Sequence, residues 1–188
     1  MIIVIGGKAG AGKSTIAKEL AKKLDLKHHS MGDLQRQIAE KRGISLSELS
    51  KLEEQDSTID KELDQKQKEL AENEDNFVID GRLCVFFMPN ADFKIFLEAE
   101  EETRAKRILK DNRNGEKAEN EKELTEKLQQ REQSEIKRFK EYYHLDCYDK
   151  SKYDTVIDTT NLTIENIVSQ INKLIKQTLV AKSLEKQK

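Results

Sequence analysis

Residues 1–15 read MIIVIGGKAGAGKST, and this stretch decides the fold. Residues 2–5 (IIVI) are a short β-branched run, which predicts a buried central strand that ends at Gly6-Gly7. From Ser14 to Leu24 apolar residues recur at helical spacing, which predicts a helix. Between the two, residues 7–14 (GKAGAGKS) match the pattern G-x-x-x-x-G-K-[ST]. A strand before this pattern and a helix after it are the context that a Walker A phosphate-binding loop (P-loop) requires.

The residue types in this loop suit a triphosphate. Glycines let the backbone curl so that its N–H groups face an anion at the N-terminus of the helix. Lys13 would neutralise the β- and γ-phosphate oxygens, and Ser14 would ligate Mg²⁺. The alternative is a glycine-rich turn without a ligand, which the strand and helix context disfavours. The residues predicted to bind ATP are Gly7, Lys8, Ala9, Gly10, Ala11, Gly12, Lys13, Ser14 and Thr15.

The rest of the chain alternates between strand and helix patterns. Further strands are predicted over 26–30, 77–80, 91–99 and 153–160, and further helices over 33–42, 43–52, 57–74, 100–110, 123–143 and 163–179. This alternation predicts an α/β fold of the P-loop NTPase type, with a five-stranded parallel sheet flanked by helices. We expect a single domain over 1–180 and a frayed tail over 181–188. The helix over 57–74 is so charged that we expect it to be solvated and outside the core, and we expect a mobile loop over 111–122.

Charge and cysteine content disfavour several classes of protein. The 34 basic and 36 acidic residues give a net charge of −2, which offers no bulk reason to bind nucleic acid or a membrane. Cys84 and Cys147 lie far apart, so we expect two free thiols in a reducing compartment rather than a disulfide or a zinc site. No apolar run approaches the length of a membrane span. We therefore expect a cytoplasmic protein. We also expect a monomer, although these observations do not decide the oligomeric state.

Arginine is scarce, with eight among the 34 basic residues, so its positions are informative. The planar guanidinium group suits recognition of phosphate or carboxylate. Arg36 follows the second predicted strand, and Arg82 follows the third. Because ligands of a doubly wound sheet bind beyond the carboxyl ends of its strands, we predict that both reach the cleft of the P-loop. Two arginines there favour an acceptor that itself carries a phosphate.

Four further arginines lie on two predicted helices. Arg104 and Arg107 are three residues apart and so share a face. For Arg104 we expect a surface salt bridge, and for Arg107 a surface salt bridge and a role in the site are equally favoured. Arg131 and Arg138 flank Glu135 just after the predicted mobile loop. Arginines on a closing lid can cover the transferring phosphoryl group and exclude water, which is the role we predict for this pair, with Glu135 and Arg107 as further lid candidates.

Seven stretches carry a resemblance to a known family. They are GKAGAGKST (7–15), HSMGDLQR (29–36), IDGRL (79–83), NADFKIFLEA (90–99), RAKRI (104–108), REQSEIKRFKEYY (131–143) and YDTVIDTTN (153–161). In this order they resemble the cytidylate kinases, especially the short archaeal type, over about residues 1–175. The run CVFF at 84–87 departs from that pattern, in which a small residue and Gly-Trp tend to follow GRL. The resemblance implies that Ser30 and the 83–87 segment face the base. A Phe could stack in place of the Trp, or the pocket could prefer another base.

The resemblance implies a fold and roles for single residues. It implies a helical monophosphate-binding segment over about 32–73 and a lid over about 111–130. The residues implied to bind the monophosphate are Ser30, Asp33, Arg36, Gly81 and Arg82; Asp80 is implied to contact Mg²⁺ through water; and Lys13, Arg82, Arg131 and Arg138 are implied to be catalytic. The implied reaction is the Mg²⁺-dependent transfer of the γ-phosphoryl group of ATP to CMP or dCMP.

Several alternatives remain open on the sequence. The acceptor could be AMP, UMP or another small metabolite. The chain could also bind ATP without catalysis, although the presence of Lys13, Ser14, Asp80 and the lid arginines disfavours loss of activity. Association with RNA through the lysine-rich helices is disfavoured, because interleaved glutamates make those faces solvated surfaces.

Overall fold

The computed structural model describes the backbone of residues 1–111, 118 and 120–185, and side chains as far as residue 180. The elements, in chain order, are β1 (Ile2–Gly7), α1 (Lys13–Leu24), β2 (Lys27–Ser30), α2 (Met31–Lys41), α3 (Leu46–Glu53), α4 (Thr58–Asn73), β3 (Phe77–Asp80), α5 (Cys84–Phe87), β4 (Phe93–Glu98), α6 (Glu101–Lys110), α7 (Glu121–Tyr143), the 3₁₀ turn η1 (Lys150–Lys152), β5 (Thr155–Asp158) and α8 (Ile164–Glu185). All five predicted strands are present. The short helix α5 and the turn η1 were not predicted.

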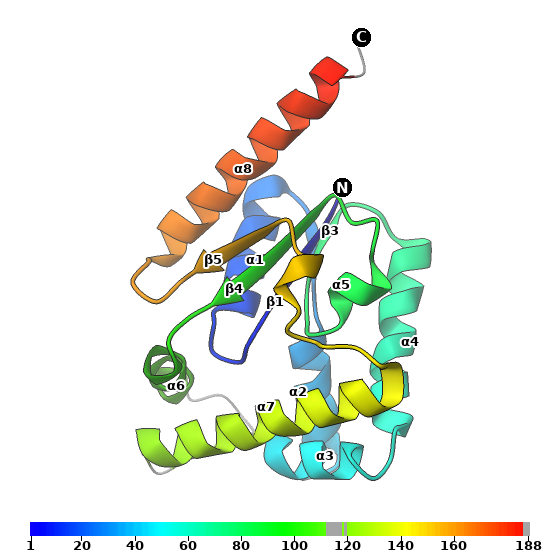
Figure 1. Ribbon diagram of the computed structural model, residues 1–188, viewed down its shortest axis with the longest axis vertical. Helices are drawn as coiled ribbons and strands as arrows, with labels where there is room; N and C mark the ends of the chain where they lie inside the picture. Colours follow the sequence, from blue (N-terminus) through cyan, green and yellow to red (C-terminus); the bar gives the residue numbers. More distant parts are fainter. Residues whose placement is uncertain (112–117, 119, 186–188) are drawn as a thin grey trace.

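The five strands form one parallel sheet in the order β2-β3-β1-β4-β5 (Figure 1). The predicted P-loop strand β1 is therefore central, and the predicted five-stranded parallel sheet is confirmed. Ile5 of β1 lies opposite Asp80 of β3, and Asp80 lies opposite Ser30 of β2. This register brings the residues that follow three neighbouring strands to one edge of the sheet.

Helices cover both faces of the sheet, because β1 is apolar on both sides. Ile3 and Ile5 belong to a cluster with residues of α1 and α8, whereas Val4 belongs to a cluster with residues of α4 and α5. A strand buried on both faces reads as a continuous apolar run, as IIVI does. Burial of this kind stabilises the fold by about 25 cal/mol per Å² of apolar surface.

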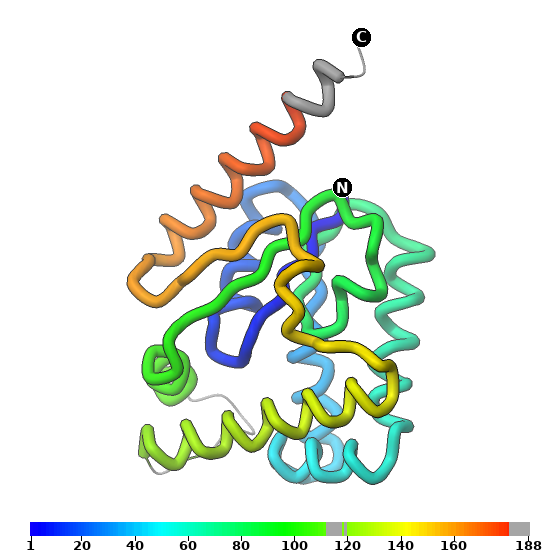
Figure 2. The backbone as a smooth tube through the Cα atoms, viewed as in Figure 1, coloured from blue at the N-terminus to red at the C-terminus, as the bar shows by residue number. Residues whose placement is uncertain are grey.

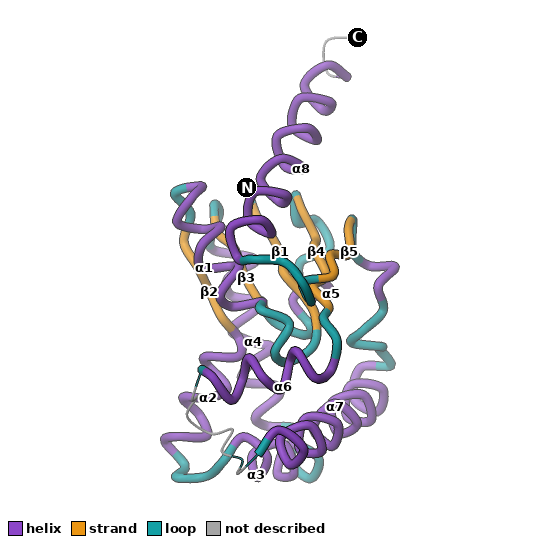
Figure 3. Tube along the Cα trace, turned by 90° about the vertical axis from the view of Figure 1, so that its left-hand side faces the viewer, coloured by secondary structure: helices purple, strands orange, loops and turns teal. Residues whose placement is uncertain are grey.

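The remaining helices gather at the end of the sheet where the strands end. Helix α7 runs across this end and contacts both α6 and α3 (Figures 1 and 3). Apolar side chains of α6 and α7 pack on Ala9 of the P-loop, and α2, α3 and α4 share a separate small core. The P-loop is therefore enclosed by helices that are distant in the sequence.

One prediction about α4 was wrong. We expected a solvated helix outside the core, but Ile59 and Leu70 are buried, and so are the polar residues Asp60, Asp64 and Gln67. The sequence did not indicate a buried face on α4, because most of the buried positions of this helix are polar. These polar side chains have partners on other helices.

Helix α3 begins with a capping box formed by Ser45 and Glu48. The Ser45 side chain accepts from the Glu48 N–H, and the Glu48 carboxylate accepts from the Ser45 N–H.

Helix α8 leaves the end of β5 and extends away from the sheet (Figure 2). Its helical backbone continues to Glu185 and so enters the segment expected to be frayed. Most of the predicted mobile loop (112–117 and 119) and residues 186–188 lie outside the described residues. Among the described helices, none is both long and apolar enough to cross a membrane.

Candidate active site

The P-loop connects β1 to α1 in a strained backbone path that glycine permits. Gly10 has φ +79°, and a Cβ atom there would lie 2.6 Å from the backbone oxygen of Arg104. Only glycine combines this left-handed conformation with so close an approach. Lys13 begins α1 and is 8% exposed, and its Nζ donates to the Lys8 carbonyl at 2.8 Å. The loop therefore makes the tight turn from strand to helix that its sequence predicts, and phosphate binding stays a prediction.

Ser14 and Asp80 lie together at the carboxyl ends of β1 and β3. The Ser14 hydroxyl donates to Asp80 Oδ1 at 2.7 Å, and the Ser30 hydroxyl donates to the same oxygen at 3.2 Å. The other oxygen, Oδ2, lies 2.9 Å from His28 Nε2. Asp80 is 1% exposed, so these partners offset the cost of burying its carboxylate.

This donor set fits Mg²⁺ and does not fit a metal caged by protein alone. Mg²⁺ prefers oxygen ligands and commonly takes one or two from protein and the rest from water and substrate phosphates. Ser14 and Asp80 offer a hydroxyl and a carboxylate beside the P-loop. Among the described residues no group of three or more His, Cys, Asp or Glu side chains could hold a metal ion. A metal here would therefore depend on the bound nucleotide.

A polar cavity of about 30 Å³ lies in front of the P-loop. It joins the P-loop to three of the predicted arginines, and its lining is Ala9, Gly10, Gly12, Lys13, Ser14, Gly32, Arg36, Asp80, Arg82, Ile108 and Arg131. Arg36 comes from α2, Arg82 from the loop after β3 and Arg131 from α7. The structure thus brings together three predicted arginines that are up to 95 positions apart in sequence. We name this space the phosphate cavity.

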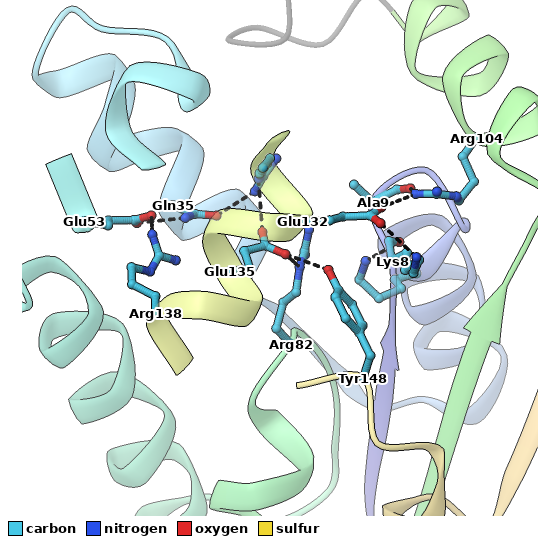
Figure 4. A network of polar contacts seen from close by, with 12 residues as sticks. Lys8, Ala9, Gln35, Glu53, Arg82, Arg104, Glu132, Glu135, Arg138 and Tyr148 are labelled. Carbon is cyan, nitrogen blue, oxygen red and sulfur yellow. Dashed lines mark hydrogen bonds and ion pairs between the residues drawn. The ribbon is translucent and has the colours of Figure 1, made fainter. Parts of the chain in front are cut away.

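Glu135 holds two of these arginines. Its Oε2 accepts from Arg82 Nε at 2.5 Å and from the Tyr148 hydroxyl at 2.7 Å, while its Oε1 accepts from Arg131 Nε at 3.1 Å (Figure 4). Burial alone would raise the pKa of Glu135, but the Arg82 and Arg131 guanidinium groups outweigh it and hold that pKa at about 2. Arg82 Nη2 is buried and has no hydrogen-bond partner among the described residues. One N–H group of Arg82 is therefore left to bind something else.

The same charges act on Lys13. Burial lowers the pKa of Lys13, the positive charge of Arg82 lowers it further, and Asp80 only partly offsets them, so that this pKa falls from 10.5 to about 7. The negative charge near Lys13 therefore does not offset the combined effect of burial and of the positive charge of Arg82. This is the electrostatic state expected where a polyphosphate binds.

Asp33 and Ser30 have local roles in the described structure. The Asp33 carboxylate accepts from Arg36 Nη2, and the Ser30 hydroxyl accepts from the Asp33 N–H and so caps α2. Gly81 lies between the buried Asp80 and Arg82, where a Cβ atom would be 2.5 Å from the sulfur of Cys84. Lys8, Ala11 and Thr15 belong to the P-loop segment but do not line the phosphate cavity, and neither does Gly7.

Arg138 lies away from the phosphate cavity. It is 2% exposed, its Nη1 donates to Glu53, and its Nε lies 3.0 Å from Asp60 Oδ2 without hydrogen-bond geometry. A second cavity, of about 50 Å³, adjoins this group. Its lining is Met31, Gln35, Asp60, Leu63, Asp64, Gln67, Arg82, Leu83, Glu135, Arg138 and Phe139. Arg82 lines both this cavity and the phosphate cavity, so the two spaces are adjacent.

The expectation that residues 83–87 surround a base stays a prediction, although the structure places these residues. Phe86 and Phe87 are half-buried against Leu83 and Phe139. Leu83 lines the second cavity. Cys84 and Val85 of α5 are instead buried in the core cluster against β3 and α4. The first half of the run CVFF therefore packs in the core, while its two phenylalanines lie beside residues that line the second cavity.

Arg104 contradicts the surface salt bridge that we predicted. It is 3% exposed, and its Nη1 donates both to the Ala9 carbonyl, at 3.1 Å, and to Glu132 of α7. Arg107 donates to Thr159 Oγ1 at 2.9 Å and to the carbonyl of Thr159. Both α6 arginines thus contact the P-loop or a residue that contacts it; Arg104 is buried, whereas Arg107 is half-buried.

Sequence reasoning missed four residues that belong to the site. His28 holds Asp80, Tyr148 holds Glu135, Glu132 joins Arg104 to Lys8, and Gln35 accepts from Arg131 Nη2 at 2.8 Å. The signal for Glu132 and Gln35 was available, because each is adjacent to a predicted site arginine. His28 and Tyr148 carried no such signal, since their partners lie on other elements.

Three comparisons with known proteins bear on this site. The profile of the Cytidylate kinase-like family matches residues 2–161. The chain is similar to the cytidylate kinase of Sulfurisphaera tokodaii, with 40% identity over 186 residues that cover 98% of this chain and 99% of the relative. It is also similar to the cytidylate kinase of Archaeoglobus fulgidus, with 39% identity over 179 residues that cover 94% and 95% of the two chains.

Solved structures support the fold. The chain is similar to a shikimate kinase from Bacteroides thetaiotaomicron, with a TM-score of 0.64 at 20% identity over 94% of this chain and 98% of that one. A shikimate kinase from Aquifex aeolicus gives a TM-score of 0.56 at 17% identity, covering 96% and 99% of the two chains. At this identity the likeness concerns the P-loop kinase fold alone. The family match over residues 2–161, together with the archaeal relatives that align over nearly the whole chain, shows that this chain belongs to the cytidylate kinase-like family.

Proposed function

We propose that this protein is a nucleoside monophosphate kinase that transfers the γ-phosphoryl group of ATP to CMP or dCMP. The observation that carries the proposal is the phosphate cavity, in which Lys13 and Ser14 of the P-loop face Arg36, Arg82 and Arg131. A donor that needs only a P-loop does not explain three additional arginines. An acceptor that brings its own phosphate does explain them.

No side chain needs to act as a nucleophile in this reaction. An oxygen of the acceptor phosphate attacks the γ-phosphorus in line, so catalysis consists of positioning and charge neutralisation. The P-loop N–H groups and Lys13 would hold the donor, Arg36 and Arg82 the acceptor phosphate, and Arg131 the transferring group. Ser14, and Asp80 through water, would hold Mg²⁺, which neutralises charge on the phosphate oxygens when it is bound. Glu135 fixes the orientation of Arg82 and Arg131 by accepting from both.

The second cavity supports a pyrimidine that carries an amino group. Cytosine presents an amine donor beside acceptors, whereas uracil presents a carbonyl at the corresponding position. Gln67 Oε1 is buried without a hydrogen-bond partner among the described residues, and it lies with Asp60 and Asp64 on the α4 wall. The Gln67 oxygen would accept from an amine, whereas a carbonyl at that position would leave it without a donor. On the opposite wall Arg138 would donate to the acceptors of the base, which gives it a role on the base instead of on the transferring group.

The size of the second cavity implies movement. Its volume of about 50 Å³ is smaller than the engineered cavity of about 150 Å³ that binds benzene in another protein. The segment that carries α2 to α4 would therefore have to move away from α7 to admit the base. This agrees with the monophosphate-binding segment expected over about 32–73.

We infer further that the protein acts as a monomer in the cytoplasm. Within one copy of the chain, the phosphate cavity already brings the P-loop together with Arg36, Arg82 and Arg131. Both cysteines, Cys84 and Cys147, are buried free thiols, as suits a reducing compartment. The substrates would be ATP and the nucleoside monophosphate, with no nucleic acid or membrane.

Steady-state kinetics with a panel of acceptors test the proposal. The enzyme would be assayed for ADP release with Mg²⁺, ATP and each of CMP, dCMP, UMP, AMP and shikimate. We expect turnover with CMP or dCMP at a kcat/KM at least about tenfold above the others, on the scale of one mispaired hydrogen bond. Turnover with UMP, AMP or shikimate in preference to CMP would reassign the acceptor. ATP binding without any acceptor-dependent ADP release would support the non-catalytic alternative.

A further inference from the structure

The outward carbonyl groups of the P-loop need partners of their own. A loop that turns its N–H groups toward a phosphate turns its carbonyl oxygens away, and buried carbonyl groups require hydrogen bonds. The Ala9 carbonyl accepts from Arg104 Nη1 at 3.1 Å, and the Ala11 carbonyl accepts from Thr159 Oγ1 at 3.1 Å. The conformation of the loop therefore depends on residues behind it as well as on the nucleotide in front.

Arg104 is placed to fix the loop in two ways. Its guanidinium group holds the Ala9 carbonyl, and its backbone oxygen lies against Gly10, where a Cβ atom would be only 2.6 Å away. Its side chain is 3% exposed, so its charge is compensated inside the protein by Glu132. Both hydrogen bonds come from Nη1, whose two N–H groups lie in the rigid plane of the guanidinium group, so arginine fixes the direction of each bond.

Glu132 connects the same group to α7. Its Oε1 accepts from Arg104, and its Oε2 accepts from Lys8 Nζ at 2.8 Å, so that one carboxylate holds two cations that contact or belong to the P-loop (Figure 4). The neighbouring residue on α7 is Arg131, which lines the phosphate cavity. The distance between the P-loop and Arg131 is thus set partly by this contact.

We propose that Arg104 is a positioning residue for the phosphoryl donor: with Glu132 it holds the P-loop in its phosphate-binding conformation and in register with Arg131. The role of Arg104 in phosphoryl transfer rests on the proposed function. The effect of Arg104 on ATP binding can be measured without any acceptor. The competing interpretation is that Arg104 and Glu132 form a buried ion pair that only stabilises the fold.

The test compares nucleotide affinities of two variants with the wild type. Arg104→Lys keeps the charge but replaces the rigid planar guanidinium group with an ammonium group on a flexible stem, which is not held in position to donate to Ala9 and Glu132. Glu132→Gln removes the carboxylate that Arg104 and Lys8 share. Calorimetry would measure the Kd of ATP and of ADP with Mg²⁺ and the Kd of CMP, beside the melting temperature of the free protein. We expect the Kd of ATP and the Kd of ADP each to rise about tenfold or more, as for loss of a charged hydrogen bond. The Kd of CMP should change less than about twofold.

Lys106→Gln is the matched control, because it removes an exposed cation of α6 that pairs with Glu102. We expect its nucleotide affinities to match the wild type. The proposal is overturned if a folded variant binds ATP as the wild type does, or if the affinities for ATP and CMP fall together with the melting temperature. It is also overturned if neither variant folds, since Arg104 would then be a stability residue. Because binding of ATP and ADP needs no turnover, failure of the acceptor assignment would leave this result interpretable.

Discussion

At the scale of single residues, the charges at the end of β3 show why this chain buries Asp80 and Arg82 beside an apolar strand. Asp80 is held by Ser14, Ser30 and His28, and Arg82 is held by Glu135. Their positions could be predicted from the sequence, because residues that follow a parallel strand must reach the cleft. Their partners could not, because Glu135 comes from a helix 53 positions further along and no local pattern connects the two.

Replacing Arg82 tests its role with the acceptor phosphate. For Arg82→Ala we expect a raised KM for CMP and a loss of kcat/KM worth about 2–4 kcal/mol, on the scale of truncating one partner of a buried charge pair. Steady-state kinetics with CMP varied at saturating ATP would measure it. Arg42→Ala, at an exposed arginine just after α2, is the control. Wild-type kinetics in Arg82→Ala would remove this residue from the site.

The lowered pKa of Lys13 predicts a proton linkage. In the free protein Lys13 has a pKa of about 7, whereas bound phosphates would favour its charged form. At pH 8 ATP binding should therefore take up close to one proton, and affinity should fall as pH rises above about 7. Calorimetry in buffers of different ionisation enthalpy measures the uptake.

Lys13→Met supplies the reference for that experiment, because any proton uptake by the nucleotide itself remains in the variant. Equal uptake in both proteins would show that Lys13 does not titrate. The same shift has a consequence for the free protein: between pH 7 and pH 10.5 the unfolded chain holds a proton on Lys13 that the folded protein lacks. This group should therefore make the folded state more stable as pH rises through that window.

At the scale of elements, α4 shows the limit of pattern reasoning. Its buried face carries Asp60, Asp64 and Gln67, so the usual apolar stripe is thin and the helix looked solvated. The partners that make this burial possible lie on α7, where Arg138 approaches Asp60 and Tyr143 donates to Asp64. A helix whose inner face is polar can be recognised only when the opposite helix is known.

Asp60 gives this interface a pH dependence. Burial raises the pKa of Asp60 from 3.8 to about 7, and Arg138 only partly opposes the shift. Between these pH values the folded state holds a proton that the unfolded chain has lost, so the contribution of this group to stability falls as pH rises through the window. An amide in place of the carboxyl group cannot ionise. We therefore expect the stability of Asp60→Asn, relative to wild type, to be about 2 kcal/mol greater at pH 8 than at pH 5.

Denaturant unfolding at the two pH values measures this difference. Glu62→Gln, on the exposed face of α4, is the control and should follow the wild type. An Asp60→Asn variant whose stability difference from wild type is the same at pH 5 and pH 8 would show that Asp60 is ionised throughout.

At the scale of the whole molecule, the sequence predicted the parallel α/β sheet and the P-loop at its centre, because IIVI and GKAGAGKS carry strong local signals. It did not predict the strand order, since local patterns do not say which strands are neighbours. The residues of the phosphate cavity could be predicted only in part. Lys13, Arg36, Arg82 and Arg131 were predicted and do converge. The surface salt bridge predicted for Arg104 was wrong, whereas Arg138 lies outside this cavity and its predicted role in transfer stays a prediction. A helix carrying several arginines on one face does not reveal which of them meet a buried carboxylate.

The central claim is that the acceptor beside the P-loop is a cytidine monophosphate. The most direct measurement is a competition in one vessel, with limiting ATP and Mg²⁺ and equal concentrations of CMP, dCMP, UMP, AMP and shikimate, followed by identification of the phosphorylated products. The account predicts CDP, or CDP with dCDP, as the main product, in an amount matched by ADP. UDP, shikimate phosphate, or ADP in excess that can come only from phosphorylated AMP, with little CDP or dCDP, would contradict it.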